Sequence, residues 1–270
     1  MALRYSHSRL STFENCPRQY RYRYIDKLPR LGPGVEAHVG ISVHQALERL
    51  YNAIKEGREA PGRQQVLDFY RQSWEETDPE TLRIVRRGFD LDDYFELGRH
   101  CVQSYYDLNA PFTQTETIAV EKKVEIQLDR AGRYQLIGYM DRLARAADGT
   151  YEIHDYKTSS SLPWKDDLKN DRQLALYEMG IRRELGADES IQVRHIWHYL
   201  TFEEVFTREL TRERLRSFAR STMKAIDTVE AASTYPARTS ALCHWCDFNQ
   251  QCEEGGTYVE TRPAPGLPAA

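Results

Sequence analysis

The sequence predicts an α/β protein in which a mixed central sheet is flanked by helices. Helical periodicity dominates the first part of the 270-residue chain, and three consecutive strand-like segments with Gly-containing turns between them follow it. A further helix then precedes a fourth strand. The first three strands can pair as an antiparallel meander, and the crossover helix can return the chain to a strand parallel to its neighbour. We expect one large domain over 1–254.

The first part of the chain is expected to be helical. Residues 6–25 carry Ser and Thr caps and Pro17 at a helix start, which indicate short helices. Pro and Gly interrupt the pattern at 29–34, and a long amphipathic helix is expected over 36–55. Within a helical part at 36–112, an inserted lobe is expected from helices over 64–74 and 91–108.

The sheet core is expected at 113–210, where the period changes from helix to strand. The Gly-rich and Pro-rich end at 255–270 predicts disorder. The expected strands are 117–128, 134–145, 151–157, 191–200 and 204–209, and the expected helices are 170–185 and 211–230.

Composition limits the classes of function. The chain is 40% hydrophobic and 29% charged, and it has no run of about 18 apolar residues that could cross a membrane. Its start lacks the apolar core of a secretory signal. Five cysteines in a chain of this size favour a reducing, cytoplasmic location, where thiols act as ligands more often than as disulfides. The net charge of −4 argues against a wholly basic protein but allows a local nucleic-acid patch.

A basic, tyrosine-rich segment near the N-terminus is one such patch. Cationic side chains neutralise phosphates and tyrosine rings stack on bases, so the segment is a candidate for binding DNA. A solvated helix with a tyrosine-lined core face explains the same pattern. The candidate DNA contacts are Arg18, Tyr20, Arg21 and Arg23.

An acid and a lysine share one strand face, because Asp155 and Lys157 are two residues apart. Whether Asp141 joins them depends on the register of the hairpin. A two-residue Asp-Gly loop would send Asp155 to the other face. A three-residue loop over 147–149, with Gly149 in the left-handed region, sets Asp141 opposite Asp155. We predict the three-residue loop.

The same construction at the preceding turn, ending at Gly132, places Glu121 opposite Asp141. Carboxylates gathered on a sheet repel one another unless a cation lies between them, and hard oxygen ligands suit Mg²⁺ or Mn²⁺. A neighbouring Lys157 could then orient water and offset charge in a transition state. The alternative is that the acids form ordinary surface ion pairs of about 0–1 kcal/mol.

Three further polar residues lie on predicted helices. His44 could supply a nitrogen ligand that favours Mn²⁺, although a lone helical histidine is more often a core or surface residue. Gln173 and Tyr177 are four residues apart and share a helix face. They could contact Lys157 or a DNA base, or form a pair at the edge of the core.

Four of the five cysteines lie at the two ends of the chain, as Cys16 and then Cys243-x2-Cys246-x5-Cys252. Four thiolates can hold either Zn²⁺ or an iron–sulfur cluster, and the spacing does not choose between them. Cys101 stands outside this pattern, and we expect it to be buried as a small apolar residue.

The ordered set of motifs over about 6–253 resembles the RecB-like branch of the PD-(D/E)XK nuclease superfamily. It is also similar to the CRISPR-associated adaptation exonucleases and to AddB-type nuclease domains, which share an iron–sulfur staple. Met140 replaces the proline of the superfamily's name, and Asp155 stands where many relatives have Glu. The matching stretches are Ser11-Thr-Phe-Glu-Asn-Cys16-Pro-Arg-Gln-Tyr-Arg-Tyr22, Gly40-x3-His44-x3-Glu48, Gly138-Tyr-Met-Asp141, Asp155-Tyr-Lys157, Gln173-x3-Tyr177 and Cys243-His-Trp-Cys246-x5-Cys252.

The resemblance implies a restriction-endonuclease-like α-βββ-α-β core and a role for each motif. Lys157 would be the catalytic lysine, and Glu121 an accessory residue with weaker family support. The metal ligands would be His44, Asp141, Asp155 and the backbone carbonyl of Tyr156. The remaining assignments are Gln173 and Tyr177 supporting the site and nearby DNA, and Cys16, Cys243, Cys246 and Cys252 holding a [4Fe-4S] cluster that joins the termini.

The resemblance therefore leads us to expect a Mg²⁺- or Mn²⁺-dependent DNA exonuclease that acts on single-stranded ends in repair or recombination. The chain lacks a Walker-type phosphate-binding motif, so a separate helicase or recombination factor could recruit it. One alternative is an adaptation nuclease that trims spacer precursors beside a CRISPR integrase. The other is a non-catalytic DNA-binding subunit that kept the fold and the cluster.

Overall fold

The structure is a computed structural model that describes residues 4–186 and 191–264. Its centre is a five-stranded sheet in the order β1-β2-β3-β4-β5. Strands β1, β2 and β3 form an antiparallel meander, β3 and β4 are parallel, and β5 pairs antiparallel with β4. The predicted mixed sheet is confirmed. The strands are β1 Thr115–Gln127, β2 Gln135–Ala146, β3 Tyr151–Lys157, β4 Val193–Tyr199 and β5 Glu204–Glu209.

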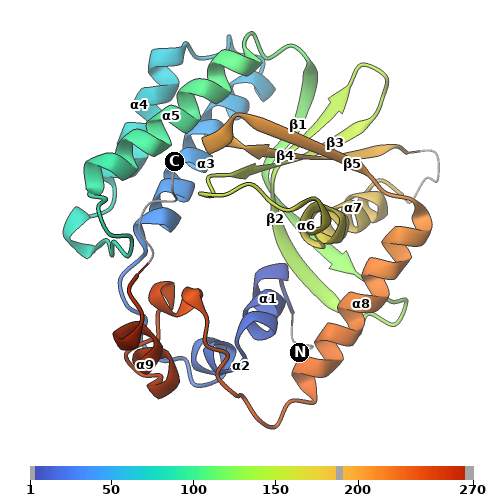
Figure 1. Ribbon diagram of the computed structural model, residues 1–270. Helices are drawn as coiled ribbons and strands as arrows, with labels where there is room; N and C mark the ends of the chain where they lie inside the picture. Colours follow the sequence, from blue (N-terminus) through green and yellow to red (C-terminus); the bar gives the residue numbers. More distant parts are fainter. Residues whose placement is uncertain (1–3, 187–190, 265–270) are drawn as a thin grey trace.

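Helices cover both faces of the sheet (Figure 1). Helices α3, α4 and α5 form the predicted helical part on one face, and α6, α7 and α8 lie on the other. Each face has its own apolar core, with Leu47 and Val102 in the first and Leu176 and Trp197 in the second. The helices are α3 Val35–Lys55, α4 Arg63–Glu75, α5 Leu91–Asn109, α6 Lys165–Asn170, α7 Gln173–Glu184 and α8 Arg212–Glu230, with 3-10 turns at Pro79–Thr81 and Leu200–Phe202.

The two ends of the described chain meet below the sheet in Figure 1. The Arg18 backbone N–H donates to the Pro236 carbonyl at 3.3 Å, and the Tyr22 hydroxyl donates to the Gln251 carbonyl at 3.2 Å. These contacts bring the first helices against the C-terminal segment, as a staple between the ends requires. The elements are α1 His7–Asn15, α2 Pro17–Tyr20, a π-helical turn Arg21–Ile25, a 3-10 helix Ala241–Trp245 and α9 Glu253–Thr261.

The hairpin turns set the register that the glycines predict. Gly149 and Gly132 have φ of 87° and 73°, in the left-handed region. The Ala146 N–H donates to the Thr150 carbonyl around a loop over 147–149, and Arg142 pairs with His154, so Asp141 and Asp155 face each other at the next position. The pairs Val120–Arg142 and Lys122–Met140 bracket Glu121 and Asp141 in the same way.

Two expectations about helices are wrong. The helix predicted over 170–185 begins later than expected, as α7 at Gln173, because Asp171 adopts ψ of 120° and its side chain accepts the Leu174 N–H. The short helix α6, which ends at Asn170, was not predicted. The predicted disorder at 255–270 is wrong for 255–261, which belong to α9. Acidic residues in the first turn favour that helix, and the His244 and Tyr258 rings pack 5.9 Å apart. Residues 265–270 lie outside the described part. No described helix is long and apolar enough to cross a membrane.

Candidate active site

Three side chains from three elements converge beside the sheet. Helix α3 contributes His44, strand β1 contributes Glu121 and strand β2 contributes Asp141. His44 Nδ1 lies 3.6 Å from Glu121 Oε1 and 3.6 Å from Asp141 Oδ1. One ligating atom from each of the three lies within 4.8 Å of the others, which makes this group a candidate site for a metal ion.

The backbone N–H and carbonyl of Tyr156 orient two of these side chains. His44 Nε2 lies 2.9 Å from the Tyr156 carbonyl, so we assign a proton to Nε2; Nδ1 faces the carboxylates and can offer its lone pair to a metal ion once it loses its own proton. The Tyr156 N–H donates to Asp141 Oδ2 at 2.7 Å. The carbonyl expected to bind metal directly therefore accepts a hydrogen bond from His44 here, and its role as a ligand stays a prediction.

Asp155 and Lys157 form a second, adjoining pair on β3. Asp155 is 3% exposed, and Lys157 Nζ lies 2.7 Å from its Oδ2. Lys157 also donates to Gln173 Oε1 at 3.5 Å, and Gln173 Nε2 donates to the Tyr177 hydroxyl at 3.1 Å. Of the two residues only Gln173 contacts Lys157, and Tyr177 lies in the core at its side, so both alternatives considered for the pair are present in part. Asp155 lies outside the group of three, so its metal-binding role stays a prediction.

Gly138 allows Tyr177 to reach this pair. A Cβ at Gly138 would overlap the Tyr177 ring, which crosses directly over the β2 backbone. Tyr177 is 6% exposed and belongs to the apolar core between the sheet and α7. The glycine in Gly138-Tyr-Met-Asp141 therefore serves close packing three residues before the acid.

Burial shifts the ionisation of the site. It raises the pKa of Asp141 to about 7, because the charges of Asp155 and Glu121 add to the burial and outweigh the opposing charge of His44. Burial lowers the pKa of His44, but the hydrogen bond to Glu121 and the charge of Asp141 together raise it to about 9. Without a metal ion, the group therefore holds protons at neutral pH.

The pKa values of two ionisable groups beside the cluster, Lys157 and Glu48, are also raised. Burial disfavours the Lys157 ammonium, but the adjoining Asp155 carboxylate outweighs this effect and raises the pKa of Lys157. Glu48, to which the sequence analysis assigned no role, has its pKa raised by burial and then by the charge of Glu121. Its position one helical turn after His44, on the same face of the helix, could have indicated that it lies near the site.

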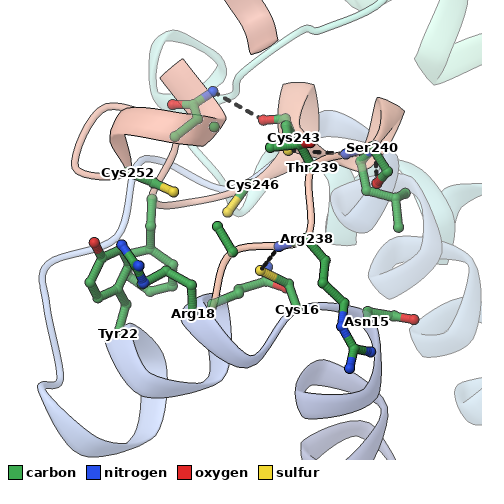
Figure 2. A pocket seen from close by; sticks show the side chains of 16 residues that line it. Asn15, Cys16, Arg18, Tyr22, Arg238, Thr239, Ser240, Cys243, Cys246 and Cys252 are labelled. Atoms are coloured by element: carbon green, nitrogen blue, oxygen red, sulfur yellow. Dashed lines mark hydrogen bonds between the residues drawn. The ribbon is translucent and has the colours of Figure 1, made fainter. Parts of the chain in front are cut away.

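The four terminal cysteines line one pocket, which Figure 2 shows between α2 and the C-terminal segment. Cys16 Sγ accepts the Arg238 N–H at 3.4 Å. Burial, followed by the charges of Cys16 and Cys243, raises the pKa of Cys246 to about 11. Cys101 is fully buried elsewhere, which confirms the expectation for it.

The N-terminal DNA-contact candidates are partly engaged in structural contacts. Tyr20 is 3% exposed and its hydroxyl accepts hydrogen bonds from Arg9, so the prediction that it stacks on a base is wrong. Arg18 donates to the Tyr235 carbonyl and pairs with Glu254 at 3.4 Å. Arg21 pairs with Asp26 at 3.0 Å. Contacts between DNA and the arginines, including Arg23, stay predictions.

A mixed sheet that carries carboxylates and a lysine on its central strands, beside a helical histidine, defines a restriction-endonuclease-like nuclease. The chain belongs to the PD-(D/E)XK nuclease superfamily, whose family model matches residues 4–253. No curated protein matches the sequence.

Among solved structures, the chain is similar to a protein from Eubacterium rectale to which an exonuclease function is provisionally assigned. The identity is 16%, the match covers 90% of this chain and 86% of that one, and the TM-score is 0.52, so the likeness concerns the fold. A protein called SSO0001 matches at 14% identity over 80% of this chain and 85% of that chain, with a TM-score of 0.34.

Proposed function

We propose that this nuclease is a Mg²⁺- or Mn²⁺-dependent deoxyribonuclease that hydrolyses phosphodiester bonds at single-stranded DNA ends, in repair or recombination. The observation that carries the proposal is the convergence of His44, Glu121 and Asp141 beside Lys157. Two carboxylates and an imidazole, with the pKa values of Asp141 and His44 both raised, suit the binding of a divalent ion better than they suit fold stability.

The donor set fits such an ion. Two carboxylates are hard ligands of the kind that Mg²⁺ and Mn²⁺ prefer, and the imidazole nitrogen favours Mn²⁺. The raised pKa of Asp141, which is caused first by burial, fits a carboxylate that a divalent ion would stabilise in its charged form. When bound, a divalent ion polarises a phosphate oxygen and lowers the pKa of a coordinated water.

Lys157 would act as a fixed positive charge. Because its pKa is raised, the ammonium stays protonated at neutral pH and is a poor general base. Held by Asp155 and Gln173, it can donate hydrogen bonds to the attacking water or to a phosphate oxygen. These contacts support the two roles expected from the sequence, which are orienting the water and offsetting charge in the transition state.

The four cysteines would hold a [4Fe-4S] cluster. Four thiols that line one pocket can hold either a zinc ion or an iron–sulfur cluster. The resemblance to nucleases with an iron–sulfur staple favours the cluster. Anaerobic purification followed by iron, sulfide and zinc analysis tests this part of the proposal.

Cleavage of end-labelled single strands with Mn²⁺ tests the activity. We expect Lys157→Ala to lower the rate by at least about 100-fold, because it removes a charge that acts in the transition state. The matched control is Lys123→Ala, which removes a lysine on β1 that pairs with Glu125 at the surface and should cleave like the wild type. If the wild-type protein binds strands but leaves them intact, the non-catalytic alternative replaces this proposal.

A further inference from the structure

A cavity of about 520 Å³ adjoins the candidate active site. One wall is the loop over 158–161, which directly follows Lys157. Thr158 lies against Gly40, where a Cβ would be 3.4 Å from the Thr158 Oγ1, and Gly40 stands one helical turn before His44. Val39, in the cavity lining, is five residues from His44, or about 7.5 Å along the helix axis. The cavity therefore lies about one nucleotide away from the carboxylate cluster.

Four aromatic rings from three parts of the chain line this cavity. Phe89, Tyr94, Phe202 and Trp245 come from the inserted lobe, the turn after β4 and the cysteine segment. Phe89 and Tyr94 already pack together, with ring centroids 5.4 Å apart. Phe202 is 38% exposed, and within the described ranges no aromatic ring packs against it. Its face is free to receive another flat ring.

The polar part of the lining suits the edges of a base. Ser159, Ser160 and Ser161 supply hydroxyl groups, which both donate and accept hydrogen bonds. Arg86 donates to Ser160 and so joins the inserted lobe to the loop after β3. Hydroxyl groups can pair with the edge of any base, which predicts little preference for sequence.

A half-buried carboxylate, Glu36, holds the walls together. Glu36 Oε1 accepts the Tyr94 hydroxyl at 2.9 Å and the Trp245 indole N–H at 3.0 Å. These bonds connect α5 and the cysteine segment to the first turn of α3, the helix that carries His44. Arg83 adds two bonds, to the carbonyls of Trp245 and Cys246. The cavity is therefore a built feature with fixed walls.

We propose that this cavity receives the unpaired base of a nucleotide next to the scissile phosphate, with Phe202 as its stacking surface. The proposal rests on the proposed nuclease function and adds the means of choosing single strands. A base within a duplex stack cannot enter such a cavity without leaving its partner, whereas an unpaired base enters freely.

A fluorescent base placed at successive positions of a single strand tests the proposal directly. With 2-aminopurine, the protein and EDTA to prevent cleavage, we expect strong quenching at one position near the end. Phe202→Ala should abolish that quenching, Phe202→Tyr should retain it, and thermal melts should verify folding of both. The control variant Leu185→Ala loses an apolar side chain that is 39% exposed and outside the cavity lining. It should retain the quenching.

Cleavage of strands with one abasic nucleotide provides the second measurement. At the quenched position, loss of the base should slow cleavage of the adjacent bond by about 5- to 150-fold, the range expected for one stacked base. Uniform quenching, quenching unaffected by Phe202→Ala, or equal cleavage at all abasic positions would overturn the cavity proposal while leaving the nuclease intact. Absence of cleavage from every strand would instead overturn the proposed function.

Discussion

At the scale of single residues, the backbone of Tyr156 organises the candidate site. Its carbonyl accepts from His44 Nε2 and its N–H donates to Asp141. Tyr156 also lies between Asp155 and Lys157, whose side chains form the adjoining ion pair. Movement of the Tyr156 backbone would therefore disturb His44, Asp141 and the Asp155–Lys157 pair, and the pairing of Tyr156 with His198 on β4 fixes its position.

Metal affinity should rise steeply with pH. In the metal-free site Asp141 is protonated below about pH 7 and His44 is cationic below about pH 9, and both protons must leave before the groups can bind an ion. Between these pH values, affinity should increase by up to about tenfold per pH unit for each proton released. Calorimetry of Mn²⁺ binding in buffers of different ionisation enthalpy measures the proton release. Affinity that is constant from pH 6.5 to 9 would contradict the assignment.

At the scale of elements, the hairpins were predictable and the cluster was predictable only in part. Gly132 and Gly149 fix the turns, and a turn fixes the pairing of every following residue. The sequence therefore placed Glu121, Asp141 and Asp155 on neighbouring strands. It could not show that Glu121, expected as an accessory, lies beside His44, because that contact depends on how α3 packs on β1.

The breaks in helices were harder to predict from local pattern. Asp171 can either continue a helix or cap the next one, and only the packing of α7 on the sheet decides between these. The Gly-rich start of α9 has the composition of a disordered tail. Gly255 is nevertheless buried, where a Cβ would be 3.3 Å from Cys252 Sγ.

The substitution Gly138→Ala tests how α7 packs against strand β2. The new methyl group overlaps the Tyr177 ring, so α7 or the ring must move, at a cost of about 1–3 kcal/mol in unfolding free energy. Denaturant unfolding measures the loss. Cleavage should fall as well, because Tyr177 holds Gln173 and Gln173 contacts Lys157. Tyr177→Leu in the Gly138→Ala background should recover stability but not activity, and a fully active Gly138→Ala protein would contradict the coupling.

At the scale of the whole molecule, the two termini close around the sheet through the cysteine pocket. Cys16 lies at the junction of α1 and α2, and the other three cysteines lie more than 220 residues later. The same C-terminal segment contacts the inserted lobe through Arg83 and the first turn of α3 through Glu36. A loss of order in the cysteine segment would therefore remove contacts that position α3, the helix that carries His44.

Cys246→Ser should release the ends of the chain. We expect loss of bound iron and faster proteolysis near residues 16–30. The Tm should also fall, by about 2–4 °C for each 1 kcal/mol lost from the free energy of unfolding. Cys101→Ala provides the control, because this cysteine is buried away from the pocket and its sulfur lies near Thr201. It should keep the wild-type iron content. Equal iron in Cys246→Ser and the wild type would contradict the proposed cluster.

The measurement that most directly tests the central claim is pulsed EPR of Mn²⁺ bound to the whole protein, alongside cleavage by the same samples. The wild-type spectrum should show coupling to one imidazole nitrogen. His44→Ala should lose both this coupling and cleavage, whereas His100→Ala, which removes a surface histidine near Glu203, should keep both. Nitrogen coupling that persists in His44→Ala, or cleavage that survives there at the wild-type rate, would contradict a catalytic metal site at His44, Glu121 and Asp141.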